Sequence, residues 1–168
     1  MPEANLHEII GKQYRASMAM LREAITKCPE SLWLAPEYPN KFWHIAYHVL
    51  YCTHMYVQNS REEFKEWKKH RENYQWLGGL PWAPNERPKI ETPYTQEEIL
   101  EYCEICRQEI DGKVPSLNFG APSGFFWLTF NKLELQIYNI RHIHHHTGQL
   151  IDRVRTVAGI GIGWVVAG

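Results

Sequence analysis

Apolar residues recur at helical spacing in four long stretches of this 168-residue chain. The first, residues 5–27, carries one apolar stripe, and the second, residues 40–58, is apolar on most sides and should be buried. The third covers residues 95–111, and the fourth runs from about 125 to 157. No convincing hairpin pattern accompanies them. The sequence therefore predicts one domain, residues 1–168, with an all-α fold of the four-helix bundle type.

Local signals mark the ends of these stretches. Asn5 and Asn40 suit N-cap positions, where a side-chain oxygen accepts a backbone N–H. Thr95 and Glu98 stand three residues apart, as in a capping box. Gly112 suits the position just after a helix, where a left-handed backbone is common. These signals predict the first three helix starts and the end of the third helix.

The segments between the helices differ in character. Residues 29–40 hold three prolines and predict an ordered loop, whereas residues 59–73 are highly charged and allow a short surface helix. Residues 74–93, with four prolines and two tryptophans, form a long aromatic loop between the second and third helices. Such a loop is either a lid or binding loop, or a packed cover over the bundle. The Gly-rich, apolar tail after residue 158 should pack back on the protein.

The composition limits the classes of partner. The net charge is −1, so nothing favours nucleic acid or an anionic membrane surface, and no apolar run is long enough to span a bilayer. No signal peptide is visible, so we expect a cytoplasmic protein whose four cysteines are reduced. Aromatic residues make up 13% of the chain, with seven tryptophans. That share favours rigid packing units or a pocket lined by stacking side chains.

Four of the nine histidines lie within residues 141–150, inside the fourth helical stretch. His142 and His146 are one helical turn apart and about 40° apart around the axis. His145 lies at the edge of this face, and His144 points to nearly the opposite side. Two imidazoles at this spacing can reach one metal ion, as in helical zinc motifs. The alternative is a polar helix face whose histidines are only hydrogen-bonded.

A second set of candidate ligands lies on the second helical stretch. His44 and His48 are again one turn apart, and Cys52 follows after another turn. Two helices that each project imidazoles inward can build a metal site in a bundle core. His44 is either a fourth ligand, a general base, or a buried histidine hydrogen-bonded beside the site. A Cys52 thiolate would bind zinc strongly, although the residue also suits a place in the cavity lining.

Residues 141–150 and residues 45–50 together resemble the motifs of the DinB-like (DinB/YfiT-like) superfamily of metal-dependent enzymes. Those proteins carry a His-x-x-x-His-x-Gly-Gln type motif on the fourth helix and one histidine on the second. The resemblance implies an up-down-down-up bundle and a metal site formed by His48, His142 and His146. It further implies one divalent ion, zinc or nickel, and a homodimer. Some members, such as bacillithiol- or mycothiol-dependent enzymes, catalyse thiol transfer or isomerisation.

Three neutral imidazoles with an open fourth position are typical of a catalytic metal site. The sequence therefore predicts a metal-dependent enzyme, a hydrolase or a thiol S-transferase, that acts on a small molecule such as a low-molecular-weight thiol. The alternative is a non-catalytic metal-binding bundle with a structural or regulatory role. A helical partner-binding module is a third possibility, which rests only on the aromatic loop. His44 and Gln149 are the candidate catalytic residues.

Gln149, Arg153 and the cysteine pair of the third helix each allow two interpretations. Gln149 is placed to hold a ligand histidine or to contact a substrate. Arg153, next on that face, either pairs with a substrate carboxylate or, as we expect, reaches solvent at the end of the bundle. Cys103 and Cys106 form a C-x-x-C pattern on the third helix. No strand–helix–strand pattern surrounds it, so we interpret the two as buried small hydrophobic residues.

Overall fold

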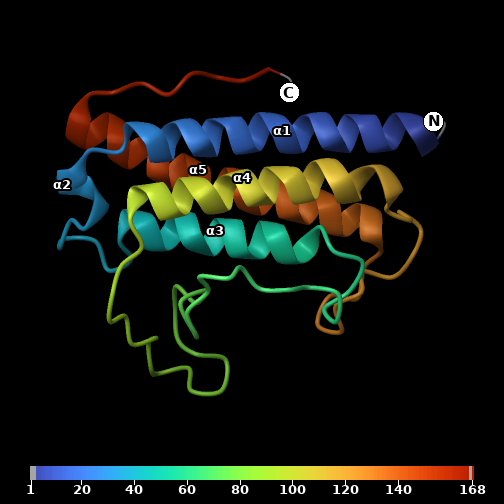
Figure 1. Ribbon diagram of the computed structural model, residues 1–168, viewed down its shortest axis with the longest axis horizontal. Coiled ribbons are helices and arrows are strands. Elements are labelled where there is room, and N and C mark those ends of the chain that lie inside the picture. Colours follow the sequence, from blue (N-terminus) through green and yellow to red (C-terminus); the bar gives the residue numbers. More distant parts are fainter. Residues whose placement is uncertain (1–2, 167) are drawn as a thin grey trace.

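Four long helices lie side by side in the computed structural model, which describes residues 3–166 and 168 (Figure 1). Between them lie two short helical turns and long irregular connections, and the described residues contain no β-strand longer than an isolated bridge. The prediction of an all-α fold is therefore confirmed. The elements are α1 (Glu3–Lys27), α2 (Glu30–Trp33), α3 (Phe42–Tyr56), α4 (Gln96–Lys113), the 3-10 turn η1 (Val114–Ser116) and α5 (Lys132–Ala158).

The core lies where the long helices meet. Helix α1 packs against α4 and α5, and α3 packs against the same two helices from the other side. Because each helix turns an apolar stripe inward, large side chains such as Leu50, Tyr102 and Ile143 are fully or almost fully buried. One buried polar link also joins α1 to α5. There the Tyr14 hydroxyl donates to Gln136 Oε1 at 2.8 Å and accepts from Asn139 Nδ2 at 3.0 Å.

Several helix ends differ from the sequence-based predictions. Asn5 lies inside α1, and the N-cap of α3 is Lys41 instead of Asn40. Gly112 lies within α4, which ends at Lys113, where the turn η1 with its Pro115 follows directly. None of Asn5, Asn40 and Gly112 caps a helix end in the structure. Packing of the apolar face contributes most of a helix's stability, so a helix can begin or end without these capping residues.

The start of α5 is the largest boundary error. The sequence places it near residue 125, but the helix begins at Lys132, after the N-cap Asn131. The Asn131 side chain accepts the Glu134 backbone N–H at 2.9 Å. Phe125 is buried in the preceding loop, whose fold is held by the Ser123 hydroxyl. Apolar residues that anchor this loop were therefore mistaken for the first turns of a helix.

The N-terminus of α4 matches its prediction. Thr95 Oγ1 accepts the Glu98 backbone N–H at 3.2 Å, and Glu98 Oε2 accepts the Thr95 backbone N–H at 3.0 Å, which completes a capping box. We expect Thr95→Ala to lower the free energy of unfolding by about 1 kcal/mol, because it leaves one amide at the helix start unpaired. Urea unfolding would measure this. Thr95→Ser keeps the hydroxyl and should stay close to wild type; an equal loss in both variants would contradict the capping explanation.

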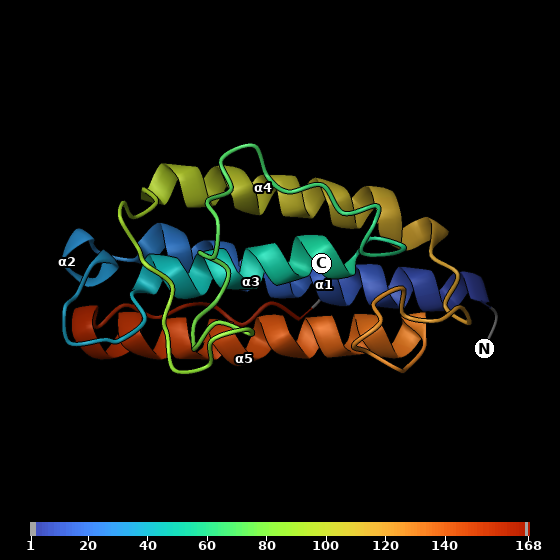
Figure 2. The same ribbon diagram turned by 90° about the horizontal axis from the view of Figure 1, so that it is seen from below.

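The connections form most of the remaining structure. Residues 30–33 form a helical turn inside the predicted loop, and residues 59–73 form turns and extended backbone in place of a short helix. The connection from α3 to α4 covers the side of α3 that faces away from α1 (Figures 1 and 2). None of the described helices combines the length and the apolar character needed to cross a membrane.

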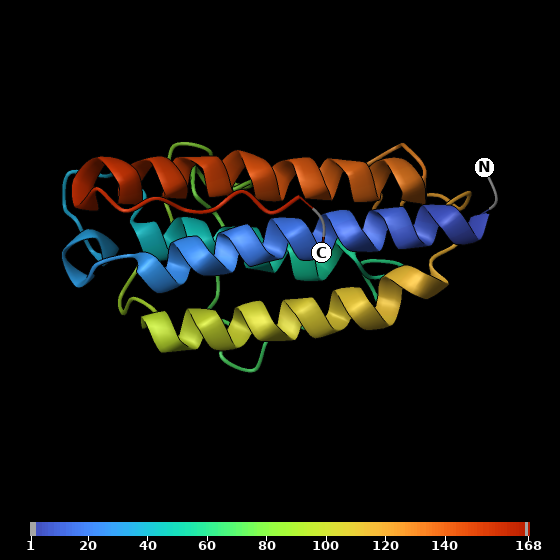
Figure 3. The same ribbon diagram turned by 90° about the horizontal axis from the view of Figure 1, so that it is seen from above.

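The tail after α5 runs back between α5 and α1 (Figure 3). Ile160 and Ile162 pack against the core, and Lys27 Nζ donates to the Gly161 carbonyl at 3.2 Å. Trp164 and Val166, in contrast, remain mostly exposed. The prediction of a packed tail therefore holds for its first half only.

The C-x-x-C pair on α4 lies in the core. Cys103 and Cys106 are both buried, and all four described cysteines are free thiols. Burial raises the pKa of the Cys103 thiol to about 12, so this sulfur remains protonated near neutral pH. The interpretation of this pair as small hydrophobic residues is thus supported.

Candidate metal centre

Three histidines from two packed helices converge on one point. His48 projects from α3, and His142 and His146 project one turn apart from α5. The ring centroids are 4.9 Å apart for His48 and His142, 5.0 Å for His48 and His146, and 4.7 Å for His142 and His146. One nitrogen from each ring lies within 4.8 Å of the other two. The three rings therefore surround a common point from three sides.

Hydrogen bonds on the outer side of two rings fix which nitrogen can bind a metal. His48 Nδ1 lies 2.6 Å from the Gln75 carbonyl oxygen, and His146 Nδ1 lies 2.8 Å from Gln149 Oε1. Both partners are acceptors, so each Nδ1 carries the proton and donates it. In a neutral imidazole the other nitrogen, Nε2, then carries the lone pair. Outer-shell bonds of this type orient metal-binding histidines and set their tautomer.

The third ring, His142, is placed differently. Its Nε2 lies 3.0 Å from His48 Nε2, whereas its buried Nδ1 has no hydrogen-bond partner among the described residues. Without an ion, this short approach requires a proton between the two nitrogens, and His142 must supply it because His48 carries its own proton on Nδ1. With an ion, both lone pairs can point at the same centre. An ion at Nε2 would place the proton of His142 on Nδ1, so this ring lacks the outer hydrogen bond that His48 and His146 make.

Burial keeps the three rings neutral. Burial, together with a smaller effect of neighbouring imidazoles, lowers the pKa of His48 to about 4 and that of His142 to about 3. Burial also lowers the pKa of His146, against the opposing effect of its bond to Gln149. Neutral imidazole is the form that binds metal ions. At pH 7 no proton has to leave these side chains before an ion binds.

We therefore expect zinc affinity to depend weakly on pH. Three histidines of ordinary pKa, about 6.5, would together weaken binding about 1,000-fold at pH 5.5, since a proton occupies each in about nine of ten molecules. Here the lowered pKa values shift that competition to more acidic solution. Between pH 7 and pH 5.5 the affinity should fall less than about tenfold. Competition with a chromophoric chelator at both pH values measures it, and a loss near 1,000-fold would contradict the lowered pKa values.

The distances suit a first-row ion after a small adjustment. Zinc holds imidazole nitrogens at about 2.0–2.1 Å, so nitrogens of one tetrahedral shell lie roughly 3.3 Å apart. His48 Nε2 and His142 Nε2 already approach within 3.0 Å, and the widest separation in the group is at most 4.8 Å. Rotation of side chains closes a difference of this size. The residues present therefore fit a three-histidine metal site.

Two other predicted candidates do not join the three histidines. His44 Nε2 donates to the Tyr74 carbonyl at 2.8 Å, and burial lowers the pKa of His44. The Cys52 thiol is buried, which raises its pKa to about 12, so it resists the ionisation that metal binding requires. No fourth His, Cys, Asp or Glu from the described chain completes the group. The arrangement leaves one side for a water molecule or substrate.

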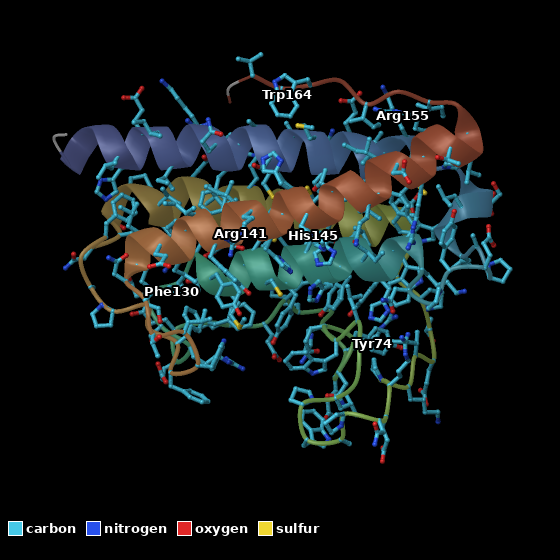
Figure 4. All side chains as sticks on the ribbon, turned by 180° about the vertical axis from the view of Figure 1, so that it is seen from behind. Tyr74, Phe130, Arg141, His145, Arg155 and Trp164 are labelled. Atoms are coloured by element: carbon cyan, nitrogen blue, oxygen red, sulfur yellow. The ribbon has the colours of Figure 1, made fainter. Side chains whose placement is uncertain are left out.

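The remaining histidines of the cluster face elsewhere. His144 Nε2 lies 2.8 Å from Ser17 Oγ on α1. The ring therefore points away from the three histidines, as helix geometry predicts. His145 is exposed and lies next to His146 (Figure 4). Arg153 neither reaches freely into solvent nor faces the three rings. It donates to the Asn40 carbonyl at 2.9 Å and stacks over Tyr38.

Sequence reasoning missed the contribution of the long loop. The carbonyl groups of Tyr74 and Gln75 accept hydrogen bonds from His44 and His48, so two consecutive peptide units hold the loop against α3. Tyr74 is labelled on this loop in Figure 4. A backbone carbonyl can accept a hydrogen bond whatever the side chain of its residue, so the sequence does not predict these bonds. Only the abundance of aromatic residues in this loop indicated that it packs on the protein.

The three histidines that were singled out as ligands thus lie together, and no fourth His, Cys, Asp or Glu of the described residues joins them. Neither a protein-family model, nor a curated protein, nor a solved structure matches this chain. The geometry of the histidine group is the main observation from which a function can be argued.

Proposed function

We propose that the protein holds one divalent metal ion, zinc or nickel, through His48, His142 and His146, and that it is a metal-dependent enzyme acting on a small molecule. One observation carries the proposal. Outer hydrogen bonds from Nδ1 of His48 and His146 leave the Nε2 lone pairs free beside the Nε2 of His142. A hydrogen bond from His142 to His48 accounts for one pair without an ion, and the convergence of all three rings on one point is the reason to expect an ion.

The reaction we propose is hydrolysis or the transfer of a low-molecular-weight thiol. A divalent ion in such a site acts as a Lewis acid and lowers the pKa of a water molecule or thiol at its open position. The chain's own part is to exclude solvent and hold the rings. His44 serves as a positioning residue, because its bond to the Tyr74 carbonyl fixes the peptide unit beside the one that orients His48.

The helix arrangement supports the resemblance to the DinB-like superfamily. We propose a four-helix bundle of the up-down-down-up type, in which α1 and α5 run one way and α3 and α4 run the other. The colour order along the ribbons and the pairs of helices in contact support it. In such a bundle α3 and α5 are neighbours of opposite direction, which brings the middle of α3 opposite the middle of α5.

Metal analysis of purified protein tests the proposal. We expect about one ion per chain after purification without added metal, or after loading with zinc or nickel and desalting. The loaded protein is then screened with ester, amide and thiol-acceptor substrates beside chelator-treated protein. An ion without any metal-dependent turnover would favour the alternative, a metal-binding bundle with a structural or regulatory role. Absence of stoichiometric binding would reject both.

We also propose a homodimer. Its basis is the family resemblance together with apolar side chains that α5 leaves exposed, among them Ile137 and Val157. Two-fold pairs are the commonest assembly of soluble proteins. Light scattering at micromolar protein concentration should give twice the mass of one chain, and the mass of a single chain would contradict the dimer.

A further inference from the structure

A cavity of about 540 Å³ lies next to the candidate metal centre. Along α3 it begins at Cys52, one turn beyond His48, and its loop wall includes Gln75, whose carbonyl accepts the His48 hydrogen bond. Its volume is typical of pockets that take small organic ligands. The wall is formed by α3, by the connection from α3 to α4 and by the loop before α5. The lining residues are Tyr51, Cys52, Met55, Tyr56, Arg61, Glu66, Gln75, Trp76, Pro81, Trp82, Phe126 and Trp127.

Aromatic rings dominate this wall and several are exposed. Trp82 is 65% exposed, Phe126 92% and Trp127 42%. Trp82 belongs to the long loop, and Phe126 and Trp127 belong to the loop before α5. Large exposed aromatic side chains that gather around one cavity mark a binding site more often than scattered ones do. Their flat faces suit a flat ligand, since stacked and edge-to-face ring pairs are favourable.

The cavity has two charged lining residues, and they differ in the partners that they already have. Glu66 accepts the Tyr51 hydroxyl at 3.0 Å and lies 3.5 Å from His70 Nε2. Arg61 forms no ion pair and no side-chain hydrogen bond within the described part of the chain, and its guanidinium lies 5.4 Å from the Phe64 ring centre. A free guanidinium binds carboxylates through two parallel hydrogen bonds. The formal charges of the two residues balance, so the argument for an anionic ligand rests on the unpaired guanidinium of Arg61.

A second unsatisfied donor lies in the same wall. The Nε1–H of Trp76 is buried and has no hydrogen-bond partner among the described residues. Buried donors of this kind are rare in folded proteins, because leaving one unpaired costs free energy. A ligand in this cavity could place an acceptor group against the Trp76 indole. That group would then be the missing partner of Nε1–H. Gln75 Oε1, on the same wall, is a buried acceptor that also has no partner among the described residues, so the two buried groups balance and the Arg61 guanidinium is the group that favours a carboxylate over an amine.

We propose that this cavity binds an aromatic carboxylate, with its ring system between the exposed tryptophans and its carboxylate on Arg61. Binding of the acid depends only on the cavity. Its role as the substrate of the metal centre rests on the proposed function. Cys52 lies one turn after His48 on α3, and the Gln75 carbonyl accepts the His48 hydrogen bond, so such a ligand would lie near the three histidines.

Calorimetric titration with three matched probes tests the proposal: 2-naphthoate, 2-naphthylmethanol and protonated 2-naphthylmethylamine. Wild-type protein is used after chelator treatment, so that a carboxylate cannot bind through a metal ion, and again after zinc loading. We expect the chelator-treated protein to bind naphthoate at least tenfold more tightly than the alcohol, and the amine most weakly. No naphthoate binding, or tighter binding of the amine through Glu66, would overturn the proposal.

Variants separate the charge from the ring. Arg61→Gln should weaken naphthoate at least tenfold and change the alcohol less than about twofold, because the lost contact is made only by the carboxylate. Trp82→Ala should weaken both probes, whereas Trp164→Ala, which removes an exposed tryptophan of the distant tail, should leave both unchanged. An unchanged naphthoate affinity in Arg61→Gln would overturn the assignment, provided circular dichroism shows a native fold.

The two proposals fail in different ways. If metal analysis finds no bound ion and chelator-treated protein still binds naphthoate through Arg61, the proposed function is wrong and the cavity assignment stands. If the protein holds its ion and naphthoate does not bind, the cavity assignment is wrong and the metal centre stands.

Discussion

His142→Ala is expected to reduce bound metal from about one ion per chain to background, because two imidazoles cannot hold the ion as three do. His142 lies close to both other rings, since its Nε2 lies 3.0 Å from His48 Nε2 and its ring centre lies 4.7 Å from that of His146. Elemental analysis after desalting measures the loss. Circular dichroism and urea unfolding establish that the variant is folded.

His144→Ala is the matched control for this experiment. The two residues are neighbours on α5, but the His144 ring lies against Ser17 on α1. Its removal should leave metal content unchanged and weaken only the contact between α1 and α5. Full metal content in His142→Ala, or an equal loss of bound metal in both variants, would contradict the three-histidine site.

Lys132→Met is expected to lower the free energy of unfolding by about 2–5 kcal/mol. Lys132 is 2% exposed, and its ammonium donates to the Gln58 carbonyl at 3.0 Å, the Asn59 carbonyl at 2.7 Å and the Ser123 carbonyl. Burial lowers its pKa to about 8, so the ammonium form persists at pH 7. Methionine fills a similar volume and leaves three acceptors unpaired where the end of α3 meets the start of α5.

Urea unfolding at pH 7 measures the effect of this substitution. Lys12→Met serves as the control, because Lys12 is exposed and pairs only with Glu8 one turn away. Surface pairs of this kind contribute little, so the control should change stability by less than about 0.5 kcal/mol. A loss below 1 kcal/mol in Lys132→Met would mean that water replaces the ammonium at these carbonyls.

Periodicity was sufficient to find the four long helices and the histidine group. A spacing of four residues brings His142 and His146 onto one face whatever else the helix touches, and it turns His144 away. The same spacing placed His44 beside His48 on α3. Spacing alone therefore left His44 and His48 as competing ligands, and the resemblance to the DinB-like superfamily implied His48.

The loops could not be predicted in the same way. Residues 125–131 contain enough apolar side chains to continue a helical pattern, and only tertiary contacts around Ser123 show that they form a loop. The cavity was missed for a related reason. Arg61, Trp82 and Phe126 come from three separate irregular segments, and no periodicity relates positions that meet only through the path of the backbone.

The hydrogen bond between His48 and the Gln75 carbonyl has a thermodynamic consequence. An ion at Nε2 requires the proton on Nδ1, and the docked loop provides the acceptor for that proton. Metal binding and loop docking must then strengthen each other by the same factor, as linkage demands. Gln75 and Trp76 also belong to the cavity wall. Binding of an ion at the three histidines would therefore change the affinity of the cavity for its ligand, without direct contact between ion and ligand.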